Sequence, residues 1–501
     1  GNFLCNGLVN PDRGLHPAMA EVKYVHQNVG FDAIDAASGK FNITNRFYFT
    51  NLKKYQIHYS VLANGKTVKS GKVSLDIAPQ ASKEFTVPVN GLKARPGTEY
   101  FVNFSVIAVE PEPLIPAGYE IAYDQFRLPV EAERNTYKAN GPALQTQTQG
   151  DELTVSSSKV NFVFNKKSGL VTSYKVDGTE YFKDGFGIQP NFWRAPNDND
   201  YGNGAPKRLH VWKQSSKDFP VTDTKVSTED KAVLLQATYL LAAGNLYVVT
   251  YKIYPSGIVH VNAKFTSTDM QAAETEVSEA TRMATFTPGS DAARKAASKL
   301  EVPRIGVRFR LPAQMNNVQY FGRGPEENYI DRNHGTMVGI YQTTADKMYF
   351  NYVRPQENGH HTDTRWLNLS PDKGNGLVIV ADSLIGFNAL RNSVEDFDSE
   401  EALPHPYQWN NFSPEEAANH DEKAARNVLR RMHHVNDVTP RDFVEVCVDM
   451  KQQGVGGYDS WGARPEPFHQ IPANREYNWG FTLVPVRSGS QATEAAKYDY
   501  R

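Results

Sequence analysis

Residues 57–77 read IHYSVLANGKTVKSGKVSLDI, and this stretch decides the fold class. The runs 57–61 and 73–77 carry apolar side chains at every second position. A period of two predicts strands that bury one face. Asn64-Gly65 lies between the runs, and this dipeptide tolerates the positive φ angles of a type I′ turn. We therefore expect the two runs to pair as a β-hairpin.

The same alternation extends in both directions along the chain. From about residue 23 to residue 130, short strand-like runs follow one another, and residues 102–108 are a clear example. About a hundred residues of this kind indicate an immunoglobulin-like β-sandwich. Residues 131–150 are polar, contain a Gln-Thr repeat and show no apolar period, so we interpret them as a linker.

The rest of the chain is also predicted to consist mainly of strands. Strand-like runs separated by Gly, Pro or Asn occupy residues 160–164, 233–241, 247–254, 258–265, 307–311, 377–381 and 443–450. Such a long series favours large, curved, stacked sheets over one ordinary sandwich. The predicted fold class is all-β. One short helix is expected at Ser413-Pro414-Glu415-Glu416, which has the form of a capping box.

The composition narrows the function class. Lys and Arg total 54 against 56 Asp and Glu. This balance favours neither nucleic acid nor a membrane surface as a partner, so we expect a neutral ligand. The chain begins with Gly1 where a complete protein would begin with Met, and we expect it to be part of a longer protein. The sequence does not decide between the cytoplasm and the periplasm as the compartment of the protein.

The signals for catalysis by this chain alone are weak. Retaining hydrolysis of a glycoside needs two carboxyl groups about 5 Å apart. In a large clan of barrel glycosidases one of them belongs to a Glu that directly follows Asn, and the chain contains no Asn-Glu dipeptide. The alternation of strands and helices that a (β/α)8 barrel requires is also missing. We therefore assign no catalytic residue.

Metal-binding patterns are equally weak. The pairs His360-His361 and His433-His434 place neighbouring side chains on opposite faces of a strand, which does not suit one tetrahedral ion. Structural or solvent-facing histidines are expected. Residues 197–202 superficially resemble a calcium loop but lack its bidentate Glu, so we expect a hydrogen-bonded turn.

Two loops are better candidates for binding a sugar. Residues 454–461 form a Gly-rich loop that ends in Trp461, whose flat indole suits stacking on the C–H face of a hexose, although a Trp is more often part of a core. Residues 322–329 form an acidic loop that includes Glu327. This loop could reach a polyol, and a solvated turn explains the pattern equally well.

A series of motifs runs through the chain in a fixed order. They are residues 3–9 with Asp12-Arg13 and His16-Pro17-Ala18, Pro79-Gln80, Gln125-Phe126-Arg127-Leu128, Arg194-Ala195-Pro196 with Asp198-Asn199-Asp200, Gly324-Pro325 with Glu327-Asn328-Tyr329, Glu357-Asn358-Gly359 with Thr364-Arg365, and Gly456-Gly457 with Asp459-Ser460-Trp461. Together they resemble the C-terminal half of large bacterial β-galactosidases of glycoside hydrolase family 2.

The resemblance implies a division of the chain into domains. Residues 1–22 resemble the remnant of the end of the catalytic barrel, and residues 23–130 an immunoglobulin-like β-sandwich. Residues 131–150 would be a linker. Residues 151–487 resemble the C-terminal, small-chain domain, a large galactose-mutarotase-like β-sandwich. Residues 488–501 are small and polar and are expected to form a loose tail.

The resemblance also implies site residues. Asn6 and the backbone carbonyl of Phe3 resemble ligands of the family's active-site sodium ion, and a magnesium ion is expected only in the missing catalytic domain. Trp461 resembles the tryptophan that the last domain extends into the galactoside site as a platform for shallow binding. With Asn6 and Trp461, Glu327 is the third expected substrate-binding residue, because its loop matches one near that site.

The implied function belongs to a larger protein. The parent would hydrolyse terminal β-D-galactosides with retention, whereas this chain lacks the catalytic carboxylates and is expected to be inactive alone. Its implied partners are the galactoside, the missing N-terminal barrel and further copies in a homo-oligomer. Two alternatives remain: a carbohydrate-binding small subunit, or a sugar epimerase-like domain with His360 and Glu357 as the acid–base pair.

Overall fold

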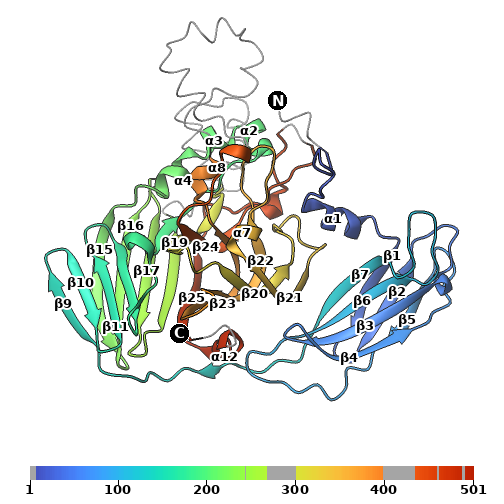
Figure 1. Ribbon diagram of the computed structural model, residues 1–501, viewed down its shortest axis with the longest axis horizontal. Coiled ribbons are helices and arrows are strands. Elements are labelled where there is room, and N and C mark those ends of the chain that lie inside the picture. The colour runs from blue at the N-terminus through green and yellow to red at the C-terminus, as the bar shows by residue number, and fades with distance from the viewer. Residues whose placement is uncertain (1–6, 243, 268–300, 399–434, 460–461, 488–490) are drawn as a thin grey trace, which may run out of the picture.

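The computed structural model describes residues 7–242, 244–267, 301–398, 435–459, 462–487 and 491–501. Strands dominate, and they form two sheet bodies joined by an extended segment (Figure 1). The all-β prediction is therefore confirmed. The helix expected at Ser413 lies outside the described residues.

The N-terminal body contains a three-stranded and a four-stranded sheet. The smaller sheet has the order β1-β2-β5, with β1 Val29–Asp35, β2 Lys40–Asn45 and β5 Ser82–Thr86. The larger has the order β4-β3-β6-β7, with β3 Tyr55–Ala63, β4 Lys66–Val73, β6 Tyr100–Ala108 and β7 Glu120–Leu128. Phe31 from one sheet stacks on Phe104 from the other at a centroid distance of 4.8 Å, so an aromatic core joins them.

The predicted hairpin turn and its first strand are confirmed. Ala63 pairs with Lys66, and the two residues between them have the positive φ angles of a type I′ turn, 45° at Asn64 and 73° at Gly65. The predicted second run was misplaced: β4 ends at Val73 and so shares only that residue with the run 73–77, because the ladder continues directly from the turn at Lys66.

The second body contains a five-stranded and a twelve-stranded sheet. The five-stranded sheet consists of β9 Gln145–Gln149, β10 Glu152–Ser156, β11 Val160–Asn165, β12 Leu170–Val176 and β13 Thr179–Glu180. The larger sheet consists of β14 Gln189–Asn191, β15 Val221–Glu229, β16 Ala232–Leu240, β17 Leu246–Ile253, β18 Val259–Thr266, β19 Arg304–Pro312, β20 Asn317–Gly324, β21 Met337–Thr344, β22 His361–Ser370, β23 Gly376–Leu390, β24 Phe443–Gln452 and β25 Tyr477–Val486. Phe162 of β11 and Tyr251 of β17 meet at 5.7 Å, so the two sheets share one core.

Helices are short and lie outside the sheets. The α-helices are α1 Ala18–Val25, α2 Asp198–Gly202, α3 Ala205–Arg208, α4 His210–Ser215, α7 Ala345–Met348, α8 Val394–Phe397 and α12 Ala492–Ala495. Single 3-10 turns occupy Leu52–Lys54, Lys183–Gly185, Val435–Asp437 and Pro467–His469. Within the described ranges, none of these helices has the length and apolar character needed to cross a membrane.

Two segments differ from the expectation. The predicted linker contains β8 Asn135–Thr136 and β9, and every residue of β9 pairs with β10. All β9 side chains are exposed, which explains how a Gln-Thr repeat forms an edge strand without an apolar period.

The described part of the predicted tail, residues 491–501, is packed: α12 is followed by β26 Tyr498–Asp499, and the Tyr254 hydroxyl donates to the Tyr500 carbonyl at 2.7 Å. Tyr500 is 4% exposed, and burial of its ring opposes a loose conformation.

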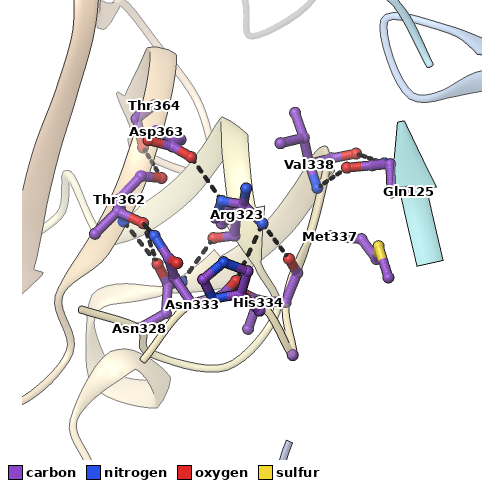
Figure 2. Close-up of polar contacts among 12 residues, drawn as sticks. Gln125, Arg323, Asn328, Asn333, His334, Met337, Val338, Thr362, Asp363 and Thr364 are labelled. Atoms are coloured by element: carbon purple, nitrogen blue, oxygen red, sulfur yellow. Dashed lines mark hydrogen bonds and ion pairs between the residues drawn. The ribbon is translucent and has the colours of Figure 1, made fainter. Parts of the chain in front are cut away.

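The two bodies contact each other through specific hydrogen bonds. The hydroxyl of Tyr123 in β7 donates to the carbonyl of Gly335 at 2.9 Å. Glu99 forms an ion pair with Arg365 at 2.8 Å. The side chain of Gln125 in β7 reaches the backbone of Val338 in β21 (Figure 2). The loop between β20 and β21 is therefore bordered by both bodies.

Candidate functional site

Segments that are far apart in the sequence enclose a cavity of about 310 Å³. They are the N-terminal segment, the start of α2, the loop after β20, the loop before β22 and the segment after β24. Polar and charged lining residues include His16, Asn197, Asp198, Asn199, Glu327, Arg332, Arg354, Gln356 and Glu357. The cavity thus presents hydrogen-bond donors and acceptors together, as sites for polyhydroxylated ligands require.

Glu327 is held rigidly in the cavity wall. It is 6% exposed, and both carboxylate oxygens have donors. Oε1 accepts from Nη2 of Arg332 at 2.9 Å and from the hydroxyl of Tyr352, while Oε2 accepts from the backbone N–H of Gly359 at 2.6 Å. Three donors on one carboxylate fix its orientation.

The donors to Glu327 keep their protons. Burial raises the pKa of the Tyr352 hydroxyl, and the charge of Glu327 raises it further. Burial disfavours the charged form of Arg332, but the neighbouring Tyr352 and Glu327 outweigh that effect and raise its pKa. Tyr352 therefore donates as a neutral hydroxyl and Arg332 as a cation.

Asn328 fixes the backbone on either side of Glu327. Its Oδ1 accepts from the backbone N–H and from the hydroxyl of Thr362 at 2.9 and 2.6 Å. Its Nδ2 donates to the carbonyls of Arg323 and Glu326, both at 3.1 Å. Asn328 is fully buried, so this amide replaces water as the partner of otherwise unpaired backbone groups.

The guanidinium of Arg323 holds the far end of the same loop. It pairs with Asp363 at 2.6 Å and donates to the carbonyls of Asn333 and Thr336 at 3.0 and 2.8 Å (Figure 2). The loop between β20 and β21 therefore folds around one cation. This network gives Glu327 and Arg332 fixed positions.

His16 contributes the N-terminal wall. Its Nε2 lies 2.7 Å from Oδ1 of Asn10, and its ring meets Phe350 and Tyr352 edge-on, each at 5.9 Å. Burial lowers the pKa of His16, and the positive charge of Arg332 lowers it further. A neutral imidazole with two aromatic neighbours forms a flat, weakly polar face beside the charged groups.

A buried arginine joins α2 to the segment after β24. The Arg194 guanidinium pairs with Asp200 at 3.0 Å and donates to the carbonyls of Gln453 and Gly454 at 2.7 and 3.0 Å. Asp200 also closes a capping box with Asn197 at the N-terminus of α2. Residues 197–202 therefore form a capped helix where a turn was expected, because Asn197 satisfies the first free N–H groups.

Two further contacts position the loop that leads to Trp461. Nδ2 of Asn197 donates to the carbonyl of Val455 at 2.8 Å, and Nδ2 of Asn199 donates to the carbonyl of Asp459 at 3.0 Å. Asp331 accepts from the N–H of Gly456 at 2.8 Å. The 453–459 segment is therefore tied to both α2 and the loop that carries Glu327.

A buried charged network lies behind Glu357. Arg304 is 0% exposed; its Nη2 lies 3.2 Å from Oε1 of Glu357, and its Nε lies 3.2 Å from Oδ2 of Asp449. Asn388 donates to Oε1 of Glu357 at 2.9 Å, and its Oδ1 lies 3.0 Å from Nδ1 of His360. Asn388 thus lies between Glu357 and His360 and is a hydrogen-bond partner of both.

The histidine pair is structural, as expected. Burial lowers the pKa of His360 to about 3 and that of His361 to about 4, so both rings are neutral. Tyr329 stacks on His360 at 5.4 Å, and His361 stacks on Phe387 at 5.3 Å. His433-His434 lie outside the described residues. Among the residues that the structure describes, no cluster of three His, Cys, Asp or Glu suits a metal ion.

Of the site residues that the family resemblance implies, only Glu327 is described by the structure, and it lines the cavity. Phe3, Asn6 and Trp461 lie outside the described residues. Sequence analysis assigned no role to Tyr352, Arg332 or Arg354, although all three line the cavity. None belongs to a motif with recognisable spacing, so their convergence depends on strand pairing between β20, β21 and β22.

Comparison with known proteins identifies relatives along the whole chain. Family models for the β-galactosidase small chain and for β-galactosidase domain 4 match residues 156–483 and 41–129. A β-galactosidase of Priestia megaterium is 32% identical over 489 residues, covering 97% of this chain and 41% of that protein. A β-galactosidase of Streptococcus thermophilus is 26% identical over 490 residues, covering 97% and 41%. The chain thus spans about two fifths of the length of these relatives.

Solved structures give a weaker likeness. A galactose mutarotase related enzyme from Lactobacillus acidophilus aligns with 67% of this chain and 97% of its own, at 10% identity and a TM-score of 0.31.

Proposed function

The chain belongs to the β-galactosidase family, and from this premise we propose that it is the non-catalytic C-terminal part of an enzyme that hydrolyses terminal β-D-galactosides. The catalytic carboxylates would belong to a barrel in the remaining part of the protein. Hydrolysis would proceed with retention, through a covalent galactosyl-enzyme intermediate. This chain would complete the substrate pocket.

One observation carries the proposal. The cavity of about 310 Å³ is lined by Gly7, by Val455-Gly456 and by Glu327 at once. Gly7 directly follows Asn6, and Gly456 precedes Trp461 by a few residues. The two segments for which the family resemblance implies contact with the active site therefore lead to the same cavity as Glu327.

The chemistry of the cavity supports a sugar ligand. Carboxylates at Glu327 and Glu357 accept hydrogen bonds from hydroxyl groups, and guanidinium groups at Arg332 and Arg354 donate to hydroxyl oxygens. The charges of opposite sign nearly balance, which suits a neutral polyol better than an ion. We propose that Glu327 contacts the galactoside directly.

Trp461 would be the aromatic platform of this pocket. An indole against the C–H face of galactose would orient the substrate toward the distant carboxylates. In the full-length enzyme, Trp461→Ala should raise KM. Tyr458, which is 87% exposed in the same loop and does not line the cavity, supplies the control Tyr458→Ala. Unchanged KM and kcat in the Trp461→Ala enzyme would contradict the platform role.

A sodium ion would complete the site. The proposed ligands are the Phe3 carbonyl and the Asn6 side chain, whose neutral oxygens suit a hard cation. When bound, the ion would supply a positive charge that orients sugar oxygens. Magnesium would belong to the missing catalytic domain, and the full-length enzyme would be a homo-oligomer.

The 501-residue chain alone provides a second test. We expect the pure chain to leave a nitrophenyl β-galactoside uncleaved and to leave the mutarotation of pure α-galactose at the buffer rate. Cleavage would contradict the proposal that the catalytic groups lie elsewhere. Acceleration of mutarotation would favour the epimerase-like alternative.

A further inference from the structure

A second cavity lies where the two bodies of the chain meet. Its volume is about 500 Å³, and its walls come from the β3–β4 hairpin, the segment 91–98 before β6, β21 and α12. In Figure 1, β4 and α12 lie at the lower edge of the molecule. The second cavity shares no lining residue with the cavity that contains Glu327.

The lining is cationic. Lys66, Lys69, Lys93 and Arg95 all line the cavity, and no Asp or Glu is among the lining residues. Thr98 and Thr493 add hydroxyl groups, and Leu92 and Ile340 add apolar surface. Several positive charges around one hollow raise the local concentration of anions.

Most of these charges have no internal counter-ion. In the described ranges, the side chains of Lys66, Lys93 and Arg95 form no ion pair. The nearby carboxylates are engaged elsewhere: Glu99 pairs with Arg365 at 2.8 Å, and Glu494 pairs with Lys497 at 2.6 Å. The positive field in the cavity is therefore not cancelled by neighbouring side chains.

The walls that carry the cations are held in place. Nδ2 of Asn64 donates to the carbonyl of Gly97 at 2.9 Å, and Oδ1 of Asn64 accepts from the N–H of Glu99 at 2.8 Å. The Tyr100 hydroxyl donates to the Lys93 carbonyl at 2.8 Å, which fixes the backbone between β5 and β6. Lys69 donates to the carbonyl of Asn90.

The second body contacts the hairpin and the segment that line the cavity. A Cβ on Gly65 would lie 2.9 Å from the backbone nitrogen of Ile340, so the hairpin tip touches β21 directly. A Cβ on Gly97 would lie 2.8 Å from the carbonyl oxygen of Ala496, next to α12. Ile340 and Thr493 of the second body line the cavity, so a ligand that fills it would contact both bodies.

We propose that this cavity binds a small phosphate-bearing molecule. The phosphate oxygens would accept charge-assisted hydrogen bonds from Lys66, Lys93 and Arg95, and the rest of the ligand would lie on Leu92 and Ile340. This site goes beyond the proposed galactoside site, because its chemistry selects an anion. Because the ligand bridges the two bodies, its binding stabilises their junction and raises the melting temperature of the chain.

Calorimetric titration of the 501-residue chain with inorganic phosphate and with phenyl phosphate tests the proposal. We expect saturable binding of both, with tighter binding of phenyl phosphate, a higher melting temperature and weaker binding in added salt. Binding of inorganic phosphate alone would overturn the role of Leu92 and Ile340. Absence of saturable binding of either anion would overturn the site.

A pair of charge-reversal variants locates the site. Lys93→Glu combined with Arg95→Glu should weaken binding at least about tenfold, since it reverses two cations in the cavity. Lys53→Glu combined with Lys72→Glu changes the net charge equally at exposed positions outside the cavity and should bind as the parent chain does. Equal losses in both variants would mean a diffuse charge effect and overturn the proposal. Neither result depends on galactoside binding.

Discussion

The side-chain amide of Gln125 pairs with both backbone polar groups of Val338. Its Nε2 donates to the Val338 carbonyl at 2.9 Å, and its Oε1 accepts from the Val338 N–H at 2.8 Å (Figure 2). Nε2 also donates to Oδ1 of Asn103 at 2.9 Å. One side chain of the N-terminal body therefore completes the hydrogen bonding of β21 in the second body.

Gln125→Leu should weaken this junction. Leucine keeps the approximate size of the side chain but leaves the N–H and carbonyl of Val338 unpaired at a half-buried position, which costs about 1–3 kcal/mol. Urea unfolding of the chain measures the loss. Gln145→Leu, at an exposed position of β9, is the control and should change the free energy of unfolding little. Equal stability of the two variants would contradict a role for Gln125 at the junction.

Tyr352→Phe should affect Glu327 while leaving the fold intact. The substitution removes the hydroxyl that donates to Oε1 of Glu327. With that donor gone, the carboxylate is held by Arg332 and Gly359 alone, and we expect KM of the full-length enzyme to rise several-fold with little change in kcat. Tyr349→Phe is a matched control, because the buried Tyr349 hydroxyl has no hydrogen-bond partner among the residues that the structure describes. A KM that rises equally in both variants would point to general loosening of the segment.

Arg304→Met should be strongly destabilising. Removing the guanidinium leaves Glu357 and Asp449 as buried carboxyl groups without their cation, and breaking a buried ion pair from one side costs about 3–5 kcal/mol. Asp449→Asn should cost much less, because burial already raises the pKa of Asp449 to about 7 and favours its neutral form. Thermal unfolding of the two variants gives the comparison. A milder loss from Arg304→Met than from Asp449→Asn would refute this ranking.

The pair Glu21–His334 should make stability depend on pH. The side-chain hydrogen bond to Glu21 raises the pKa of His334 above its ordinary value of 6.5. Burial opposes ionisation of Glu21, but its hydrogen bonds to His334 and Gly335 lower its pKa below 4.5. The stabilisation from His334 is thus fully present below pH 6.5 and lost as pH rises through the raised value. The stabilisation from Glu21 is present above pH 4.5 and lost as pH falls.

His334→Gln isolates this effect. The free energy of unfolding of the parent chain should exceed that of the variant most between pH 4.5 and 6.5, and the difference should shrink toward pH 8. Urea unfolding across this range measures it. A difference that stays constant with pH would show that the ring acts only through packing against Tyr24.

Much of the secondary structure could be predicted from local patterns. The predicted run 160–164 lies within β11 and the run 443–450 within β24, and β17 covers all of the run 247–254 except Tyr254. The Asn64-Gly65 turn was also predictable, because its conformational preference belongs to the dipeptide itself. The edge strand β9 was not, since a strand exposed on both faces has no apolar period to reveal it.

The sequence by itself determined the all-β fold class, through a side-chain period that each strand carries locally, and the family, through motifs in a fixed order. It also marked Glu327. Only the tertiary structure decided what surrounds Glu327: Tyr352 and Gly359 reach it through the pairing of β20 with β22. The physical reason is the distance along the chain between the residues that interact. A strand's period depends on neighbouring residues, whereas a cavity wall depends on contacts between segments that no local pattern connects.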